Sequence, residues 1–236
     1  MSKFSIIIPI YNEELNISGL VDEIFLSLIK YQNRFEIILV NDASSDNSLN
    51  IIKSLTYKYS NIIKFINNNS NLGQSFSLIE GIKKSLYKTI VTLDGDGQNN
   101  PKDIPFLIDK YFSDDKLFLI GGIRIKRKDS FIKIISSRVA NFMRKKILND
   151  NCNDTGCSLK VFDKDVFMEF PFFNGIHRFL PALFKGYGKN TFFLNVDHRA
   201  RIYGYSKYGI FLRLVRGIKD LIKVNRILKE FRRNRG

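Results

Sequence analysis

Short runs of β-branched and aromatic residues alternate with longer amphipathic segments over the first 120 residues of the chain. The short runs, which predict strands, lie at residues 4–8, 35–40, 62–66, 89–93 and 117–120. The longer segments carry apolar residues three and four positions apart and predict helices over 14–29, 46–59, 74–86 and 103–112. This alternation predicts a buried parallel sheet covered by helices, and such sheets bind ligands at the carboxyl ends of their strands.

The pattern changes in the second half of the chain. Strands are predicted at 158–162 and 191–196, the latter returning to the sheet, and helices at 131–148, which is rich in basic residues, and at 178–185. The last predicted helix, 210–231, has an apolar stripe on one face and crowded Arg and Lys residues on the other. No internal repeat or Pro-rich linker divides the sequence, so we expect one α/β domain followed by a short tail.

Composition places the 236-residue chain among ordinary globular proteins, with 44% hydrophobic and 26% charged residues. Its formal net charge of +15 suggests an anionic partner, such as a phosphate, a nucleic acid or an acidic bilayer face. The abundance of Lys, Asn and Ile offers an equally good explanation, because an AT-rich genome produces the same bias. The sequence holds no nucleic-acid recognition motif, so nucleic acid is not an expected partner.

The two cysteines, Cys152 and Cys157, are too few for a disulfide framework, and we expect free thiols in a reducing compartment. A zinc site that combines them with His177 and His198 is disfavoured, because the spacing is loose and no second cysteine pair exists. The apolar run at the N-terminus is too short for a signal peptide, and no stretch of about 18 consecutive apolar residues occurs. These features predict a cytoplasmic protein without a membrane-spanning segment.

The strongest candidate site follows the fourth predicted strand, where Asp94 and Asp96 stand one residue apart. In an extended segment residues i and i+2 project to the same side, so both carboxylates can reach one point. Such a pair suits a hard divalent cation, Mg²⁺ or Mn²⁺, and Gln98 offers a third oxygen ligand. Gly95 and Gly97 leave room for a diphosphate to approach the backbone. A solvated Asp-Gly turn is the alternative interpretation of this segment alone.

Polar residues also follow the first two predicted strands, in the segments Pro9-Ile10-Tyr11-Asn12-Glu13 and Asn41-Asp42-Ala43-Ser44-Ser45-Asp46. Because the carboxyl ends of parallel strands meet at one edge, we expect these groups where a nucleotide would lie. Asp42 can accept a hydrogen bond from a base or a ribose, whereas Asp46 is expected to cap the following helix. A turn-forming role is the alternative for Asp42.

Together these segments resemble the family 2 glycosyltransferases, in particular the dolichol-phosphate mannosyltransferase and polyprenyl-phosphate glycosyltransferase branch. The motifs of the first half are Pro9-x-Tyr11-Asn12-Glu13, Asn41-Asp42-x-Ser44-x-Asp46, Asn71-x-Gly73 with Gly81, and Asp94-x-Asp96-x-Gln98 with Pro101. Those of the second half are Gly122-Ile123-Arg124, Ser137-Arg138, and the segments 154–160 and 201–208. The resemblance implies a GT-A (Rossmann-like) α/β fold, with a mostly parallel central sheet flanked by helices and amphipathic helices in the C-terminal half. It also implies a nucleotide-sugar half at 1–123, an acceptor half at 124–207 and a basic membrane-interface tail at 208–236.

The resemblance further implies a metal-dependent, inverting transfer of a sugar from a GDP- or UDP-sugar to a polyprenyl phosphate, such as dolichyl or undecaprenyl phosphate. The implied donor-binding residues are Pro9, Tyr11, Glu13, Asp42, Asp94, Arg201 and Lys207. The implied metal ligands are Asp94, Asp96 and Gln98, and the implied acceptor-phosphate residues are Arg124, Ser137 and Arg138. Asp96, Arg124 and Arg138 would form the catalytic set. Arginine suits this task, because a guanidinium binds phosphate through two parallel hydrogen bonds.

The ionisation of the acceptor decides which catalytic groups the reaction needs. A phosphomonoester has a second pKa of about 6, so near neutral pH it can attack without a protein base. We expect neither His177 nor His198 to lie among the strand-end residues. This expectation agrees with a reaction that needs no catalytic histidine. The alternative is a family 2 glycosyltransferase that acts on a sugar hydroxyl in cell-surface polysaccharide synthesis. That reaction would need a base, and Asp154 is the candidate.

Members of this branch commonly continue past the Ser-Lys-Tyr segment, here 206–208, into transmembrane helices, whereas this chain has one further amphipathic segment. We expect 131–148 and 210–231 to attach the protein peripherally to the inner face of the membrane. Each Lys or Arg near anionic lipid contributes about 1 kcal/mol to such binding. The alternative is that both helices pack on the core or on a second subunit of a homo-oligomer.

Overall fold

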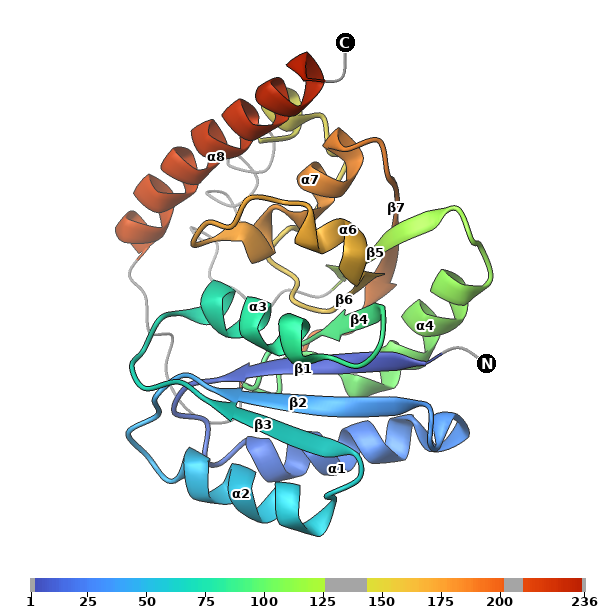
Figure 1. Cartoon of the computed structure of the whole chain (residues 1–236), viewed down its shortest axis with the longest axis vertical. Coiled ribbons are helices and arrows are strands. Elements are labelled where there is room, and N and C mark those ends of the chain that lie inside the picture. Colours follow the sequence, from blue (N-terminus) through green and yellow to red (C-terminus); the bar gives the residue numbers. More distant parts are fainter. Residues whose placement is uncertain (1–2, 126–143, 202–209, 235–236) are drawn as a thin grey trace.

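The computed structural model describes residues 3–125, 144–201 and 210–234, with side chains in the last range from Gly217 onward. Within these residues, seven strands form one sheet in the order β3-β2-β1-β4-β6-β5-β7 (Figure 1). The strands are β1 (Phe4–Ile10), β2 (Phe35–Asn41), β3 (Ile63–Asn67), β4 (Thr89–Thr92), β5 (Leu117–Arg124), β6 (Lys160–Asp163) and β7 (Asn190–Val196). Every residue of β2 is buried, as expected of an inner strand between two layers of helices.

The directions of the strands bring several of their ends to one edge of the sheet. β1 pairs in parallel with β2 and with β4, and β2 pairs in parallel with β3. β6 runs antiparallel between β4 and β5, while β7 is parallel to β5. The carboxyl ends of β1, β2, β4, β5 and β7 therefore share an edge with the beginning of β6, and the residues next to these ends form the site described below.

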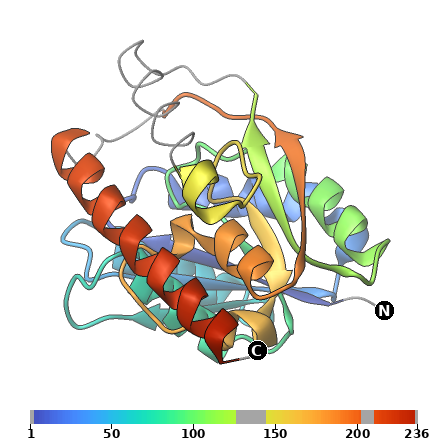
Figure 2. The same ribbon diagram turned by 90° about the horizontal axis from the view of Figure 1, so that it is seen from above.

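Helices cover both faces of the sheet (Figures 1 and 2). One face carries α1 (Ile17–Ser27), α2 (Ser48–Lys58) and α4 (Ile104–Phe112), and the other carries α3 (Gln74–Lys84), α6 (Lys164–Met168), α7 (Leu180–Gly186) and α8 (Ile210–Arg233). Short 3-10 helices are η1 (Ile29–Tyr31), η2 (Pro101–Asp103) and η3 (Ile176–Arg178). Side chains alternate along β1, so Ile6 and Ile8 belong to the core of the first face and Ile7 to that of the second.

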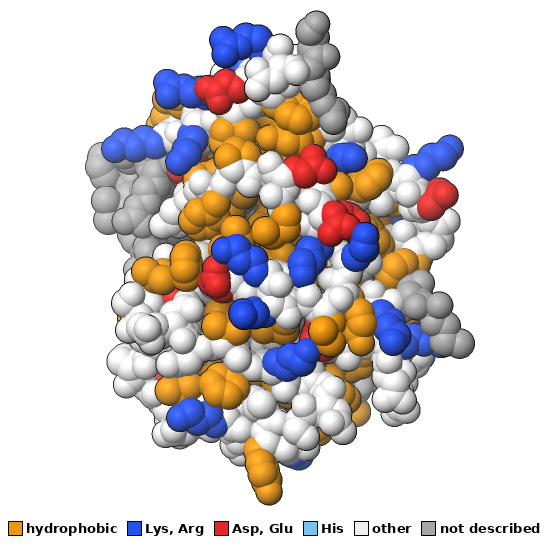
Figure 3. Space-filling view, in the orientation of Figure 1, with side chains coloured by type: hydrophobic (Ala, Val, Ile, Leu, Met, Phe, Trp, Pro, Cys, Tyr) orange, Lys and Arg blue, Asp and Glu red, His pale blue; other side chains and the backbone are white. Residues whose placement is uncertain are grey.

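The last helix, α8, packs along α7 (Figure 2). Its Val224 and Leu228 are buried, and Leu228 lies so close to Gly186 that an added Cβ would come within 2.4 Å of the leucine side chain. Ile218 and Ile222 remain 54% and 60% exposed. In the upper part of Figure 3, where α8 lies, basic side chains stand beside hydrophobic ones. Among the described residues, no helix combines the length and the apolar character that crossing a bilayer requires.

The strands predicted from the sequence are all observed, and the one predicted at 117–120 extends to Arg124 because β5 pairs with β7 along this length. The first helix begins at Ile17, later than predicted. α6 was not predicted, because five residues are too few to show a helical period. Of the helix predicted at 131–148, only 144–148 belong to the described residues, and these are helical.

Candidate active site

The loop after β1 and the loop after β2 lie at the sheet edge and are hydrogen-bonded to each other. The Asn12 N–H donates to Ser44 Oγ at 3.0 Å, and Asn12 Oδ1 accepts from the Ser45 N–H at 2.7 Å. Both loops turn through a residue in the left-handed conformation, Asn12 with φ 54° and Ala43 with φ 55°. Asparagine adopts this conformation readily whereas alanine does not, so surrounding contacts must hold the second loop in place. The pairing fixes the two loops relative to each other.

Asp42, predicted to contact the nucleotide, is buried and holds the loop before α3. Its carboxylate accepts hydrogen bonds from Asn68 Nδ2 at 2.9 Å and from the backbone N–H groups of Leu72 and Gly73 at 3.0 and 2.8 Å. Asp42 therefore has a structural task at this edge, and its contact with a nucleotide stays a prediction. The other donor-binding residues predicted at the end of β1 and in the loop after it are partly buried: Pro9, Tyr11 and Glu13.

Asp94 and Asp96 come together on a turn after β4 and not on a continuing strand. β4 ends before Asp94, and Gly97 takes a left-handed φ of 71°. The extended geometry predicted for the pair is therefore wrong, although the two residues do lie together. The turn packs against β1, where a Cβ on Gly95 would lie 3.2 Å from the Pro9 carbonyl oxygen. Glycine at this position allows the close approach.

The two carboxylates of this turn perturb each other. Burial and, secondly, the charge of Asp96 raise the pKa of Asp94 to about 6. A hydrogen bond from Ser158 and the positive charges of Lys160 and Arg124 limit this rise. Binding of one divalent cation by both carboxylates would relieve their repulsion, so the pair fits a Mg²⁺ or Mn²⁺ site. In the part of the chain that the structure describes, no group of three or more His, Cys, Asp or Glu side chains forms a metal cluster.

Gln98 and Arg201 link this turn to the segment after β7. Arg201 forms an ion pair with Asp96. The Gln98 N–H donates to Asp96 Oδ1 at 3.1 Å, and its side-chain Nε2 donates to the Arg199 carbonyl oxygen at 3.3 Å. Arg201 thus lies beside a predicted metal ligand. Its contact with donor phosphates and metal ligation by Gln98 stay predictions.

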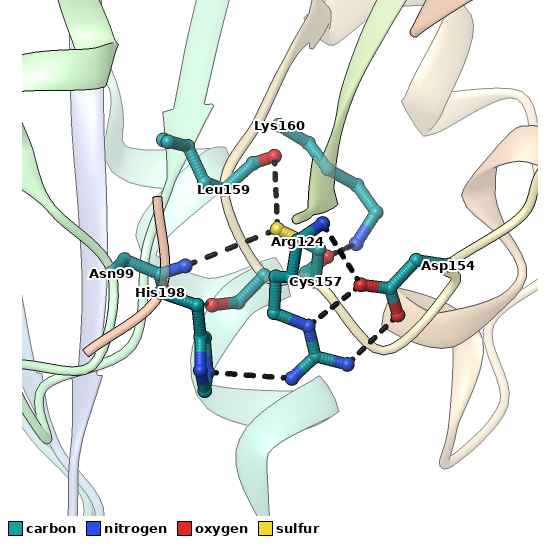
Figure 4. Close-up of polar contacts among 8 residues, drawn as sticks. Asn99, Arg124, Asp154, Cys157, Leu159, Lys160 and His198 are labelled. Atoms are coloured by element: carbon teal, nitrogen blue, oxygen red, sulfur yellow. Dashed lines mark hydrogen bonds and ion pairs between the residues drawn. The ribbon is translucent and has the colours of Figure 1, made fainter. Parts of the chain in front are cut away.

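Arg124, at the end of β5, is bound to Asp154 through two parallel hydrogen bonds (Figure 4). Nε donates to Oδ2 at 2.6 Å and Nη2 donates to Oδ1 at 2.8 Å. The two side chains are only 13% and 6% exposed. Gly156 lies against the guanidinium, since a Cβ there would be 2.8 Å from Nη2. Binding of an acceptor phosphate by Arg124 stays a prediction, and the other residues predicted for phosphate binding lie outside the described residues: Ser137, Arg138 and Lys207.

Both histidines lie at the site, so the expectation that neither does was wrong. His198 Nε2 lies 3.5 Å from Arg124 Nη1 (Figure 4), because an isolated β-bridge joins Asn99 to His198 across the edge. His177, in η3, reaches the start of α3, with Nδ1 2.7 Å from Ser75 Oγ. Segments that are far apart in the sequence bring these residues to the strand ends, and neither histidine stands in one of the motifs.

Two further residues of the site received no role from the sequence. Gln74, the first residue of α3, donates through Nε2 to Asp94 Oδ1 at 2.7 Å. Lys160, at the start of β6, is 3% exposed and donates to the Cys157 carbonyl oxygen. Gln74 directly follows the motif glycine Gly73, and Lys160 ends the 154–160 motif. The position of Gln74 directly after a motif and that of Lys160 at the end of a motif were the signals that could have identified them.

His177 makes the stability of the protein depend on pH. Burial, followed by the positive charges of Arg178 and Lys160, lowers the pKa of His177 to about 3 from 6.5. Below pH 6.5 the unfolded chain binds a proton that the folded chain excludes until about pH 3, so the free energy of unfolding falls as the pH falls through this window. Between pH 7 and pH 5 we expect His177, which is partly accessible, to account for a loss of about 1–2 kcal/mol.

Denaturant unfolding of the wild type and of His177→Asn at both pH values measures this contribution. Asparagine keeps an oxygen that can accept from Ser75 but does not titrate in this range. The variant should lose about 1–2 kcal/mol less stability than the wild type over the same interval. An identical pH dependence of the two proteins would contradict the prediction.

Residues 5–170 of the chain match the family model described as Glycosyl transferase family 2. The chain belongs to this glycosyltransferase family. The resemblance inferred from the motifs is thereby confirmed, and the acidic turn and the paired loops lie within the matched region.

Two bacterial glycosyltransferases are similar to this one over nearly its whole length. The dodecaprenyl-phosphate galacturonate synthase of Rhizobium johnstonii is 34% identical over 225 residues, which are 94% of this chain and 66% of the relative. The undecaprenyl-phosphate 4-deoxy-4-formamido-L-arabinose transferase of Yersinia pestis is 31% identical over 222 residues, which are 94% of this chain and 67% of the relative. The chain therefore spans about two thirds of the length of these relatives.

Solved structures share the fold of this family 2 glycosyltransferase. The mannosyl-3-phosphoglycerate synthase of Rubrobacter xylanophilus superposes with a TM-score of 0.74 at 12% identity, over 98% of this chain and 75% of that one. The glucosyl-3-phosphoglycerate synthase of Mycobacterium tuberculosis, crystallised with Mn²⁺, uridine diphosphate and glucosyl-3-phosphoglycerate, gives 0.68 at 13% identity, over 94% and 78%. At such identities the likeness shows the fold alone, and it confirms the predicted GT-A architecture.

Proposed function

We propose that this glycosyltransferase moves a sugar, with inversion, from a GDP- or UDP-linked donor to a polyprenyl phosphate. The names of the two bacterial relatives specify dodecaprenyl and undecaprenyl phosphate, which supports this class of acceptor. The observation that carries the proposal is the placement of the acidic pair Asp94 and Asp96 and of Arg124 at one edge of the sheet. In this reaction an oxygen of the acceptor phosphate bonds to the sugar while the nucleoside diphosphate leaves, so groups that bind a metal and a group that binds phosphate are needed side by side.

On the donor side, Asp94 and Asp96 would hold a Mg²⁺ or Mn²⁺ ion on the diphosphate. The metal, when bound, would neutralise charge on the leaving group. Arg201, which pairs with Asp96, would contact the same phosphates. Asp42 would act mainly by ordering the loop before α3, which brings Gln74 to Asp94.

The hydrogen bonds that Asp154 accepts from Arg124 favour a phosphate acceptor over a hydroxyl acceptor. A hydroxyl must give its proton to a base, and Asp154 was the candidate for that role. Both of its carboxylate oxygens accept hydrogen bonds from Arg124, so they are engaged before any substrate binds. A polyprenyl phosphate is ionised near neutral pH and needs no such base.

A transfer assay tests the proposed function directly. The full chain is incubated with Mg²⁺ or Mn²⁺, a panel of GDP- and UDP-sugars and a short polyprenyl phosphate, and the product is identified by mass spectrometry. We expect a glycosyl polyprenyl phosphate whose formation stops when a chelator removes the metal and resumes when metal is added. Transfer to free sugars without transfer to the lipid phosphate would instead support the hydroxyl-acceptor alternative.

We propose a peripheral position at the inner face of the membrane, and the exposed part of α8 supports the membrane contact. Ile218 and Ile222 are exposed on a helix whose other side packs on α7, and Lys219 and Lys223 alternate with them. An apolar pair flanked by cations binds at a lipid interface. This helix would keep the protein near an acceptor whose chain is buried in the bilayer.

Replacing both Ile218 and Ile222 by Asp should weaken binding to anionic vesicles at least about 10-fold, because apolar burial is lost and each like charge is repelled. Co-sedimentation with phosphatidylglycerol vesicles at low and high salt measures the change. A matched variant carries the same substitutions at two exposed sites of another face, Leu26 and Ile29, and should bind like the wild type. Equal binding of all three proteins would exclude α8 as the attachment site.

A further inference from the structure

A cavity of about 110 Å³ opens beside Asp94 on the face of the sheet that α3 covers. It lies between α3, the beginning of β6, the loop 155–158 and η3, and apolar side chains such as Leu78 and Phe162 form much of its wall. Because Asp94 belongs both to this lining and to the predicted metal site, a sugar joined to a diphosphate held at the acidic turn would extend into the cavity. The polar lining residues should therefore decide which sugar fits.

The hydrogen bonds of Ser75 determine which nitrogen of His177 carries the proton. Ser75 is fully buried, and its Oγ accepts from the Gly175 N–H at 2.8 Å. Its own hydroxyl proton then points to His177 Nδ1, 2.7 Å away, because a buried hydroxyl without an acceptor is costly. Neutral His177 consequently carries its proton on Nε2. This N–H is the donor that His177 can offer to a ligand in the cavity that it lines.

Arg178 and Lys160 add positive charge to the same lining. Arg178 pairs with Asp220 through Nη2 at 2.6 Å, while its buried Nε has no hydrogen-bond partner among the described residues. The amine of Lys160 is buried and donates to the Cys157 carbonyl oxygen, which leaves further N–H groups on the same nitrogen. Among the described lining residues Asp94 alone is acidic, and a bound divalent cation would neutralise it. Asp220 offsets the charge of Arg178, so with a cation at Asp94 the lining keeps an excess of hydrogen-bond donors and the positive charge of Lys160.

We propose that this cavity receives the transferred sugar and selects a uronic acid, whose carboxylate is bound by Arg178, Lys160 and the Nε2–H of His177. The inference rests on the proposed transferase function and specifies its substrate. A carboxylate accepts several hydrogen bonds and offsets the charge of the buried Lys160 amine, whereas a neutral hexose leaves that charge uncompensated. Sites built around buried polar groups discriminate strongly against ligands that leave those groups unpaired.

Calorimetry with matched donors tests the selectivity without requiring transfer. The full chain with Mn²⁺ is titrated with UDP-glucuronic and UDP-galacturonic acid, with UDP-glucose and UDP-galactose, and with UDP-N-acetylglucosamine, whose carbonyl accepts hydrogen bonds without a charge. GDP-mannuronic acid and GDP-mannose form a second matched pair. We expect the uronate donors to bind at least about 10-fold more tightly than their neutral counterparts, since charged hydrogen bonds are the stronger ones.

The outcomes separate this inference from the proposed function. Equal or tighter binding of the neutral donors would overturn the selectivity, and transfer of a neutral sugar to polyprenyl phosphate would then leave the function standing. A uronate preference without transfer to the lipid phosphate would support the selectivity and overturn the function. Binding of none of the donors would overturn both.

Two variants assign the selectivity to named residues. Arg178→Gln and Lys160→Met should each reduce the uronate preference about 10-fold, because each removes a charged hydrogen-bond donor. Asp220→Asn is the matched control, because it weakens the same ion pair as Arg178→Gln but keeps the guanidinium. Thermal unfolding shows that each variant is folded. Loss of the preference in Asp220→Asn to the same extent would give Arg178 a structural role and overturn its assignment as a carboxylate ligand.

Discussion

Replacing Asp96 by Asn is expected to lower sugar transfer by at least about 10³-fold, because several kcal/mol of charge stabilisation on the leaving diphosphate depend on the metal. The amide oxygen can still accept the hydrogen bond from the Gln98 N–H, so the turn should persist. The lost ion pair joins a buried carboxylate to the partly exposed Arg201, so some stability should be lost with it, and denaturant unfolding measures this loss separately from activity. Initial rates measured over a titration of Mg²⁺ and of Mn²⁺ quantify the effect.

Asp115→Asn is the matched control for this experiment, because it removes one carboxylate from an exposed position away from the sheet edge. It should transfer sugar at the wild-type rate and with the same metal dependence. If Asp96→Asn also kept the wild-type rate, the acidic turn would not hold the metal, and the donor side of the proposed mechanism would have to be abandoned.

The first half of the fold could be predicted because its signals are local. The segments of β1 and β2 are mostly apolar, and they alternate with helices of clear period. The position of β6 could not be predicted in the same way. It runs antiparallel between β4 and β5, and this pairing depends on packing between segments far apart in the sequence. A four-residue strand carries too little pattern to reveal its direction.

In the candidate site, too, residues with a local sequence signal could be predicted and residues positioned by distant segments could not. Asp94, Asp96 and Arg124 could be predicted, because they directly follow or end strands and stand in motifs. His177 and His198 could not, because 3-10 and bridge geometry brings them to the edge. The sequence also could not show that Asp154 holds Arg124, since residue spacing says nothing about which buried charges pair. That pairing changes the interpretation of Asp154 from a candidate base to a residue that positions the arginine.

Replacing Arg124 by Gln is expected to reduce both activity and stability. Transfer should fall about 10²- to 10³-fold, because the guanidinium proposed to bind the acceptor phosphate is lost. The free energy of unfolding should fall by about 3 kcal/mol, because the mostly buried Asp154 carboxylate loses the cation that compensates its charge. Denaturant unfolding and the transfer assay with polyprenyl phosphate measure the two effects on the same preparation. A variant that kept the wild-type KM for the lipid phosphate would contradict the acceptor role.

The double variant Arg124→Gln with Asp154→Asn separates the two roles of the arginine. With no uncompensated carboxylate left, most of the lost stability should return, because a neutral hydrogen-bonded pair costs less to bury than a single charge. Transfer should stay as low as in Arg124→Gln, since neither amide supplies the positive charge that an acceptor phosphate requires. Recovery of transfer together with stability would instead mean that Arg124 serves the fold alone, and that another cation binds the acceptor phosphate.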